Sequence, residues 1–210
     1  MKLERDFYAC DVLKASEKLL GKVLVHRTKD GVTKGRIVEL EAYNGAIDKA
    51  AHSYPNLCTE RTKVQFGEGG YAYIYFIYGM YYCMNIVTGH SNEPESVLLR
   101  ALEPADGIKL MKKRRNTEKL RNLCSGPGKL CQAMGITKEQ YGMDLCGDIL
   151  YLEDAEPVLP EDILRTKRVN VDYAEEARDF LWRYTIRDNP FVSKIKADKA
   201  NEPGGFKKQS

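Results

Sequence analysis

Strand-like patterns of apolar and polar residues dominate the middle of the chain, and helical patterns precede, interrupt and follow them. A helical pattern over 12–20, with Asp11 as its N-cap and Gly21 as its stop, leads into a strand predicted for 22–27. Three further helices and one late strand are predicted at 105–122, 127–134, 173–180 and 182–186. This order predicts an α+β fold in which a curved, mainly antiparallel sheet is flanked by helices.

The clearest alternation of apolar and polar residues runs from Arg36 to Tyr43. Successive side chains of a strand point to opposite faces, so the two kinds of residue separate here. One face receives Val38, Leu40 and Ala42, and the other receives Glu39, Glu41 and Tyr43. An edge strand with a solvated acidic face would explain this pattern, and so would a strand whose carboxylates line a catalytic cavity. The segment by itself leaves both interpretations open.

Residues 71–87 are rich in tyrosine and contain a glycine at their middle, which predicts an aromatic β-hairpin. Gly79 can adopt the positive φ of a tight reversal, so the tip would be Tyr78-Gly79-Met80. Tyrosine-rich strands commonly bury their rings in a core. Apolar side chains at a hairpin tip are also the wedges with which some proteins enter a base stack, and Ile77, Tyr78 and Met80 are the candidates here.

An arginine interrupts the apolar strand predicted over 97–102. Alternation places Leu98, Arg100 and Leu102 on one face of this strand and Val97, Leu99 and Ala101 on the other. A buried guanidinium group is normally paired. Arg100 therefore needs an acidic partner, for which Glu39 and Glu103 are the structural candidates.

The composition fits one compact domain. The chain has 210 residues, of which 43% are hydrophobic, so we expect a single domain over 1–200 and a flexible polar tail over 201–210. Its six cysteines show neither a CxxC pair nor metal-ligand spacing with histidine, which favours reduced structural thiols and no metal site. No signal peptide and no membrane-length apolar run are recognisable, so a cytoplasmic bacterial protein is expected.

Positive charge is concentrated in one segment, although the net charge of +3 argues little about partners. A basic run between Pro104 and Leu123 contains Lys109, Lys112, Lys113, Arg114, Arg115, Lys119 and Arg121. Such a run can track DNA phosphates, or it can be a solvated helix face. The sequence SGPGK, which ends at Lys129, lacks the spacing and the final hydroxyl residue of a nucleotide P-loop, so ATP is not expected. Backbone amides at the start of this helix could contact DNA or form part of a pocket wall, and Lys129 is a candidate DNA contact.

Several stretches of the chain together match one known family. They are LLGKVLV (19–25), VELEAYNG (38–45), AAHS (50–53), YIYFIYGMYYCMN (73–85), VLLRALEP (97–104), LCSGPGKLCQAMGI (123–136) and RVNVDYAEEARDFLWRYTIRDNPFVS (168–193). On these stretches the chain resembles the alkyladenine (3-methyladenine) DNA glycosylase family from Asp6 to Ser193. It departs from the family pattern at Asn170, where a glycine is common, and this bears on how closely the backbone can approach a ligand there.

The resemblance implies a monofunctional glycosylase that turns a damaged purine out of duplex DNA and hydrolyses its bond to the deoxyribose. Breaking this bond produces a cationic, oxocarbenium-like sugar, which a carboxylate can stabilise while it activates the attacking water. By family position Glu41 is that carboxylate, and Arg100 pairs with Glu41 and the water. Glu39 shares the strand face of Glu41 and is the second candidate. No metal, cofactor or lyase lysine is expected.

The resemblance also implies a pocket for the extruded base. Tyr43, His52 and Tyr75 would stack on the base, and Asn85 would screen its edge against the exocyclic amine of guanine. A two-residue turn at the hairpin tip would put Tyr75 and Asn85 on opposite faces, so a shared pocket requires an odd loop or a bulge. The expected partner is double-stranded DNA that contains damaged purines, bound by a monomer and without a membrane.

Three alternatives of other classes fit parts of the sequence. A lesion-binding protein would have the pocket without the chemistry, but the Glu41 carboxylate would then only repel DNA phosphates. An RNA-binding module would use the tyrosines as a stacking platform, and it predicts comparable affinity for undamaged single strands. A hydrolase of small nucleosides would have no use for the basic run or for the aromatic hairpin tip.

Overall fold

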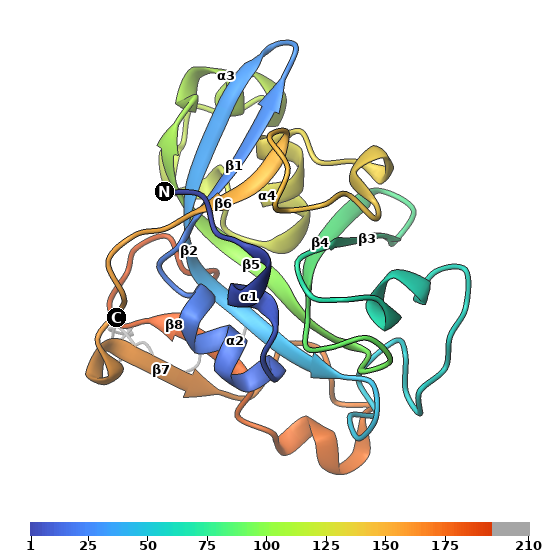
Figure 1. Ribbon diagram of the computed structural model, residues 1–210. Coiled ribbons are helices and arrows are strands. Elements are labelled where there is room, and N and C mark those ends of the chain that lie inside the picture. Colours follow the sequence, from blue (N-terminus) through green and yellow to red (C-terminus); the bar gives the residue numbers. More distant parts are fainter. Residues whose placement is uncertain (195–210) are drawn as a thin grey trace, which may run out of the picture.

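The computed structural model describes residues 1–194, and the tail expected over 201–210 lies outside them (Figure 1). The centre of the fold is an open sheet of eight strands in the order β3-β4-β5-β2-β1-β6, with β8 beside β2 and β7 beside β8. Every pairing of these strands is antiparallel. The predicted α+β class with a mainly antiparallel sheet is therefore confirmed.

The elements have the following bounds. The strands are β1 (Val23–Thr28), β2 (Gly31–Asn44), β3 (Ala72–Ile77), β4 (Tyr81–Thr88), β5 (Glu95–Asp106), β6 (Leu150–Glu153), β7 (Ile163–Thr166) and β8 (Arg183–Ile186). The α-helices are α1 (Arg5–Tyr8), α2 (Val12–Leu19), α3 (Ile108–Arg115) and α4 (Pro127–Met134). Short 3₁₀ helices are η1 (Lys63–Phe66), η2 (Leu120–Asn122), η3 (Lys138–Gln140), η4 (Pro160–Asp162) and η5 (Glu175–Asp179).

Helix α2 begins and ends close to where the sequence predicts. The Asp11 carboxylate accepts hydrogen bonds from the backbone N–H groups of Leu13 at 3.0 Å and Lys14 at 3.1 Å, which caps the first turn. Gly21 follows the helix with a φ of +89°, a conformation that side chains with a Cβ rarely adopt. Strand β1 then starts at Val23, one residue after its predicted start.

Strand β2 lies inside the sheet. One of its edges pairs with β5, and the other pairs first with β1 and then with β8. The interpretation as a solvated edge strand is therefore wrong. Glu39 and Glu41, at the middle of β2, are both 0% exposed, because β5, β8 and the chain after β8 surround them.

Alternation along four neighbouring strands separates a core face of the sheet from a polar face. The core face carries Leu40, Ala42, Ala72, Ile74, Met84, Ile86, Val97 and Leu99, all members of the main hydrophobic cluster. Helices α2 and α4 contribute apolar residues to the same cluster and cover this face (Figure 1). The opposite face carries Glu41, Tyr43, Tyr73, Tyr75, Cys83, Asn85, Leu98 and Arg100. The candidate site is built on this second face.

A β-bulge in β2 interrupts the predicted alternation. The pairing of β2 with β5 shifts register on both sides of Glu39. Ile37 joins the main hydrophobic cluster, whereas Val38, predicted for that face, does not. On β5, Leu102 joins the cluster in place of Ala101. A bulge adds a residue to one strand and changes which side chains point inward beyond it, and the apolar pattern alone does not reveal it.

The β3–β4 pair is joined by three residues, Tyr78-Gly79-Met80. Tyr75 therefore lies opposite Cys83, and the two-residue turn that would pair it with Tyr82 does not form. Because the loop has an odd length, Tyr75 and Asn85 share one face of the sheet.

Two predicted helices are shorter than expected. The segment predicted as a helix over 105–122 starts as the end of β5, forms α3 over eight residues and stops at Asn116, whose φ is +46°. The segment predicted over 173–180 forms only the 3₁₀ helix η5, whose first residue, Glu175, has a φ of +48°. Left-handed backbone interrupts α-helical hydrogen bonding at both points. The strand predicted over 182–186 is confirmed as β8.

The cysteines form no disulfides. All six are free thiols, and Cys83, Cys124 and Cys131 are buried. Within residues 1–194, no three or more His, Cys, Asp and Glu side chains are grouped as metal ligands. No helix in that part of the chain combines the length and the apolar character needed to span a bilayer.

Candidate active site

A cavity of about 330 Å³ opens on the polar face of the sheet. Its walls come from β2, β5, the β3–β4 hairpin, the start of α4 and the segment 169–173. The aromatic, polar and charged residues that line it are Glu41, Tyr43, His52, Tyr75, Tyr78, Tyr81, Cys83, Arg100, Asn170 and Tyr173. The cavity therefore brings together Glu41, Tyr43, His52, Tyr75 and Arg100, which the sequence assigns to one site.

The Glu41 carboxylate lies in the cavity wall, and three donors hold it. Its Oε2 accepts a hydrogen bond from the Tyr43 hydroxyl at 2.9 Å and one from Arg100 Nη1 at 3.4 Å. Its Oε1 accepts a hydrogen bond from the backbone N–H of Val169 at 2.7 Å. These donors come from β2, β5 and the chain after β7, so three distant segments fix the direction of one carboxylate.

The Glu39 carboxylate is bonded on both oxygens and does not line the cavity. Oε1 accepts hydrogen bonds from Arg100 Nε at 2.9 Å, Arg183 Nε at 2.8 Å and Ser193 Oγ at 2.9 Å, and Oε2 accepts one from Ser193 N at 2.7 Å. Burial by itself would raise the pKa of Glu39, but the charges of Arg100 and Arg183 outweigh it, so the pKa lies below its ordinary value. Glu39 is thus a buried anchor for two arginines.

Arg100 joins the two carboxylates. Its Nε donates to Glu39 and its Nη1 faces Glu41, while burial leaves its side chain 10% exposed. Burial disfavours the charged guanidinium, but Glu41 and Glu39 outweigh it and raise the pKa of Arg100 above its ordinary value. Glu103, the other predicted partner, instead accepts a hydrogen bond from Asn189 at 3.1 Å. The predicted pairing with Glu39 is confirmed, and the pairing with Glu103 is wrong.

The His52 imidazole lies between two polar partners. Its Nδ1 is 2.9 Å from the Tyr73 hydroxyl, and Arg61 donates to its Nε2 at 3.2 Å. A guanidinium group can only donate, so Nε2 accepts and Nδ1 carries the proton. Burial, and secondarily the charge of Arg61, lower the pKa of His52 to about 4. The ring is therefore neutral at neutral pH.

Aromatic rings enclose the cavity from two strands and a loop. The His52 and Tyr75 rings meet edge to face, with centroids 4.7 Å apart and an interplanar angle of 88°. Tyr43 approaches from β2, and burial followed by the Glu41 charge raises the pKa of its hydroxyl well above the ordinary value. Burial likewise raises the pKa of Tyr75. Both hydroxyls are thus protonated donors throughout the physiological range.

A buried ion pair behind Tyr43 was not identified from the sequence. The Arg168 guanidinium donates to both oxygens of Asp48, and both side chains are 0% exposed. Arg168 also donates to the carbonyl of Ala42 at 2.8 Å, and its guanidinium carbon lies 4.6 Å from the centroid of the Tyr43 ring. This arrangement fixes the segment that carries Val169. Arg168 lies in a stretch that matches the family, whereas Asp48 lies between the matching stretches 38–45 and 50–53. No local pattern indicates that the two residues pair.

The start of α4 forms part of the cavity wall, and it needs a glycine there. A Cβ added to Gly128 would lie 2.9 Å from the Tyr81 side chain. Any larger residue would therefore push the hairpin away from the helix. The start of α4 thus lies at the cavity wall, one of the two positions expected for it, and the packing of Gly128 against Tyr81 was not predicted.

The hairpin tip and Asn85 occupy different parts of the site. Tyr78 and Met80 are 73% and 66% exposed, whereas Ile77 is half-buried and lines the cavity with Tyr78. Asn85 is only 3% exposed and faces a smaller inner cavity, which shares Tyr43 and other lining residues with the larger one. The tip therefore projects at the cavity mouth, and Asn85 lies at its inner end.

The predicted basic residues lie away from the cavity and are partly committed to other contacts. Arg114 donates to the Ala133 carbonyl and Arg115 to the Leu123 carbonyl, which ties α3 to α4 and to the turn before it. Lys112 pairs with Glu118 at 2.8 Å, and Lys129 donates to Asn122 at 2.6 Å. Lys113 is exposed. Of this group, the two arginines thus contribute to packing between helices.

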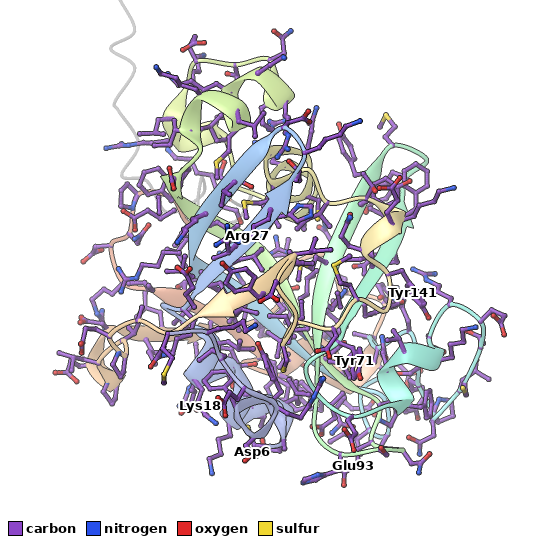
Figure 2. All side chains as sticks on the ribbon, turned by 45° about the horizontal axis from the view of Figure 1, so that its top comes forward. Asp6, Lys18, Arg27, Tyr71, Glu93 and Tyr141 are labelled. Atoms are coloured by element: carbon purple, nitrogen blue, oxygen red, sulfur yellow. The ribbon has the colours of Figure 1, made fainter. Side chains whose placement is uncertain are left out.

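A loop between β2 and β3 brings Arg61 to the site. Tyr141, labelled in Figure 2, donates its hydroxyl to the carbonyls of Glu60 at 3.1 Å and Arg61 at 3.2 Å. The Arg61 guanidinium then lies 5.1 Å from the centroid of the Tyr75 ring, beside His52. The loop is therefore held by a residue that directly follows η3 and is 80 residues away from Arg61 in the sequence.

Comparison with known proteins places the chain among relatives of similar length. A protein of Alkaliphilus oremlandii, provisionally named 3-methyladenine DNA glycosylase, is 54% identical over 202 residues, which cover 92% of this chain and 100% of the relative. Proteins of the same provisional name from Clostridium acetobutylicum and Clostridium botulinum are 50% and 52% identical. These alignments cover 94% and 92% of this chain, and 100% and 99% of the relatives.

A family model covers most of the same region. The model of methylpurine-DNA glycosylase matches residues 6–190, which include every residue that lines the large cavity. The match agrees with the resemblance noted in the sequence motifs from Asp6 to Ser193. The chain belongs to the methylpurine-DNA glycosylase family.

Proposed function

We propose that the protein is a monofunctional DNA glycosylase that flips alkylated or deaminated purines out of duplex DNA. It hydrolyses the N-glycosidic bond with a water activated by Glu41 and leaves an abasic site for base excision repair. The observation that carries this proposal is a buried carboxylate, fixed by three donors, in the wall of an aromatic cavity of about 330 Å³. This volume lies in the range typical of pockets for small ligands.

The proposed chemistry uses the negative charge of Glu41. As the bond between C1′ and the base nitrogen breaks, its electron pair leaves with the base and the sugar becomes an oxocarbenium-like cation. Glu41 stabilises that cation and takes one proton from the water whose oxygen bonds to C1′. Arg100, anchored on Glu39 at 2.9 Å, keeps its Nη1 beside Glu41 and the attacking water.

The surroundings of Glu39 and Glu41 indicate which of the two carboxylates acts as the general base. Glu39 accepts four hydrogen bonds and lies outside the cavity, so it has no free access to water or sugar. Glu41 lines the cavity. This difference supports Glu41 as the base and Glu39 as a positioning residue for Arg100.

The aromatic residues are proposed to hold the extruded base. Tyr43 covers one of its faces, and the perpendicular pair of His52 and Tyr75 covers the other. Stacking of a base on an aromatic side chain is worth roughly 1–3 kcal/mol in other nucleic-acid proteins, which offsets the cost of extrusion. Asn85, at the inner end, screens the purine edge against an exocyclic amine, because an unpaired polar group in a dry pocket is costly.

The hairpin tip is proposed as the wedge that replaces the extruded base. Tyr78 has a φ of +54°, a conformation unfavourable for a tyrosine, at a position where it is 73% exposed. Unfavourable backbone conformations that persist are concentrated at functional sites. Tyr78, with Met80 and Ile77 beside it, supports insertion into the base stack.

The decisive experiment is single-turnover release of hypoxanthine or ethenoadenine from a duplex in the presence of EDTA, followed by alkaline cleavage of the abasic product. Wild type should release the base. Glu41→Gln should bind the lesion but release the base roughly 10²- to 10⁴-fold more slowly, because it lacks the general base. Glu60→Gln, which alters a carboxylate whose side chain is 91% exposed, is the matched control.

The outcomes separate the proposed mechanism from the alternatives. Normal release by Glu41→Gln would exclude Glu41 as the base. Tight binding to duplexes with modified purines by wild type, with no release of hypoxanthine, ethenoadenine or 3-methyladenine, would identify a lesion-binding protein. Equal activity on free nucleosides would identify a small-molecule hydrolase.

A further inference from the structure

A second cavity of about 20 Å³ lies at the inner end of the site. It shares Tyr43, His52 and Tyr75 with the large cavity. Its wall also contains Tyr73, whose hydroxyl is bonded to His52. Three further polar residues complete it, namely Gln65 from η1, Asn85 from β4 and Ser96 from β5. These three residues are 3%, 3% and 2% exposed. A polar cavity of this size holds one water molecule.

The side-chain amides of Gln65 and Asn85 supply a hydrogen-bond donor and a hydrogen-bond acceptor at this cavity. Gln65 Oε1 accepts a hydrogen bond from Ser53 Oγ at 2.8 Å, so its Nε2 group is a donor without a partner among residues 1–194. Asn85 Nδ2 donates to the Tyr73 carbonyl at 3.3 Å, so its Oδ1 is an acceptor, equally without a partner among the described residues. The Ser96 hydroxyl can donate or accept. The cavity wall therefore presents a donor, an acceptor and a hydroxyl.

We propose that this inner cavity binds one ordered water and that Gln65 is a specificity-determining residue of the base pocket. The water accepts a hydrogen bond from Gln65 Nε2 and donates one to Asn85 Oδ1. Because the bond of Asn85 to the Tyr73 carbonyl is long, the water supplies the second contact that fixes the orientation of the Asn85 amide. This inference rests on the proposed glycosylase function and adds a residue to its selectivity.

The water makes the inner end of the pocket selective against an amino group. A base whose amino group reaches the cavity displaces the water. That amino group can donate to Asn85 Oδ1, but it cannot accept from Gln65 Nε2, which is left buried without a partner. A base without the amino group leaves the water in place. Because of Gln65, a base with this amino group is rejected by a hydrogen-bond mismatch as well as by the lack of room in the cavity.

Gln65→Met tests this proposal, because methionine keeps the length of the side chain and removes its donor. Single-turnover release is compared on duplexes with 7-methylguanine and 7-methylhypoxanthine, bases that differ only in the 2-amino group. Wild type should prefer 7-methylhypoxanthine, and Gln65→Met should reduce that preference roughly tenfold, the effect of one unpaired hydrogen-bonding group. Gln132→Met, which alters an exposed glutamine of α4, should keep the wild-type ratio.

A ratio of the two rates is insensitive to a general loss of folded enzyme, so it separates selectivity from stability. A crystal structure of wild type should show a water within hydrogen-bond distance of Gln65 Nε2 and Asn85 Oδ1, and that of Gln65→Met should lack it. An unchanged rate ratio, or no water between the two amides, would overturn the proposal. If wild type released neither base, the glycosylase proposal would fail, and the crystal structures would still decide the water site.

Discussion

Glu39 and Glu41 lie two residues apart on β2, and their hydrogen bonds differ in origin. Glu39 is bonded by two arginines and by Ser193, whereas Glu41 is bonded by one tyrosine, one arginine and one backbone N–H group. A carboxylate that carries four donors is a structural anchor. One that faces a cavity with fewer donors has room for a water or a cation. Glu39 and Glu41 are thus assigned different roles because their surroundings differ, although they lie on the same strand.

The lowered pKa of His52 makes the stability of the folded protein depend on pH. In an unfolded chain histidine titrates near its ordinary value of about 6.5, whereas burial and Arg61 lower the pKa of His52 in the folded protein to about 4. Between these values the unfolded chain takes up a proton that the folded protein does not. The stability contribution is therefore complete above pH 6.5 and falls as the pH is lowered toward 4.

Arg61→Gln should raise the pKa of His52, because it removes the positive charge that lowers this pKa in addition to burial. It should therefore narrow the pH range over which the stability changes. NMR titration of the His52 ring measures the effect, with Lys63→Gln as a control on the same loop. A wild-type pKa near 6.5, or an Arg61→Gln value equal to that of wild type, would contradict this account.

The elements show which features a sequence can predict. The Asp11 cap and the apolar spacing after it determine α2 locally, so its bounds were predictable. The β2 bulge depends on the pairing of β2 with β5, which is distant in the sequence, and the apolar pattern does not signal it. The apolar pattern likewise does not signal the left-handed residues that end α3 and begin η5. The five cavity residues assigned to catalysis or base binding, Glu41, Tyr43, His52, Tyr75 and Arg100, were identified through family motifs. The Arg168–Asp48 pair was not, because 120 residues separate its members and no local pattern links them.

In the β3–β4 hairpin, mutation can test the role of the exposed tip separately from the role of the residues that line the cavity wall. Tyr78→Ala removes the exposed ring but leaves Tyr75 and Cys83 in the cavity wall. Loss of stacking worth roughly 1–3 kcal/mol should weaken specific lesion binding about 5- to 150-fold. Fluorescence of a reporter base in the lesion duplex would measure extrusion. Phe76→Ala, which removes a half-exposed ring from strand β3 of the same hairpin, is the control. Unchanged fluorescence with Tyr78→Ala would remove Tyr78 from the wedge.

The basic residues of α3 divide into two groups, those that are bonded to other parts of the protein and those that are free to contact DNA. Arg114 and Arg115 are bonded to carbonyls near α4, so their loss should lower stability. Among residues 1–194, Lys112 forms an ion pair only with Glu118, whose side chain is 86% exposed, and Lys113 is exposed, so both can reach a phosphate. We expect this lysine pair to contribute to DNA affinity without regard to the lesion.

Replacing Lys112 and Lys113 together by serine should weaken binding to lesion and lesion-free duplexes by the same factor. The slope of log K against log salt concentration should decrease by about 0.9 for each phosphate contact that is lost. Lys34→Ser, which breaks the ion pair of Lys34 with Glu153 of β6, should leave the slope unchanged. Equal slopes for the double variant and wild type would show that α3 does not contact DNA.

Three of the residues that donate hydrogen bonds to Glu39 and Glu41, namely Val169, Arg183 and Ser193, follow their acceptors by 128, 144 and 154 residues. During synthesis on the ribosome, Glu41 emerges well before these partners exist. A nascent chain that ends before residue 168 contains Glu41, Tyr43, His52, Tyr75 and Arg100, yet its two acids lack these bonds. Activity should therefore arise only after translation has passed Ser193, and a premature stop between Arg100 and Arg168 should yield an inactive product although all five of those residues are present.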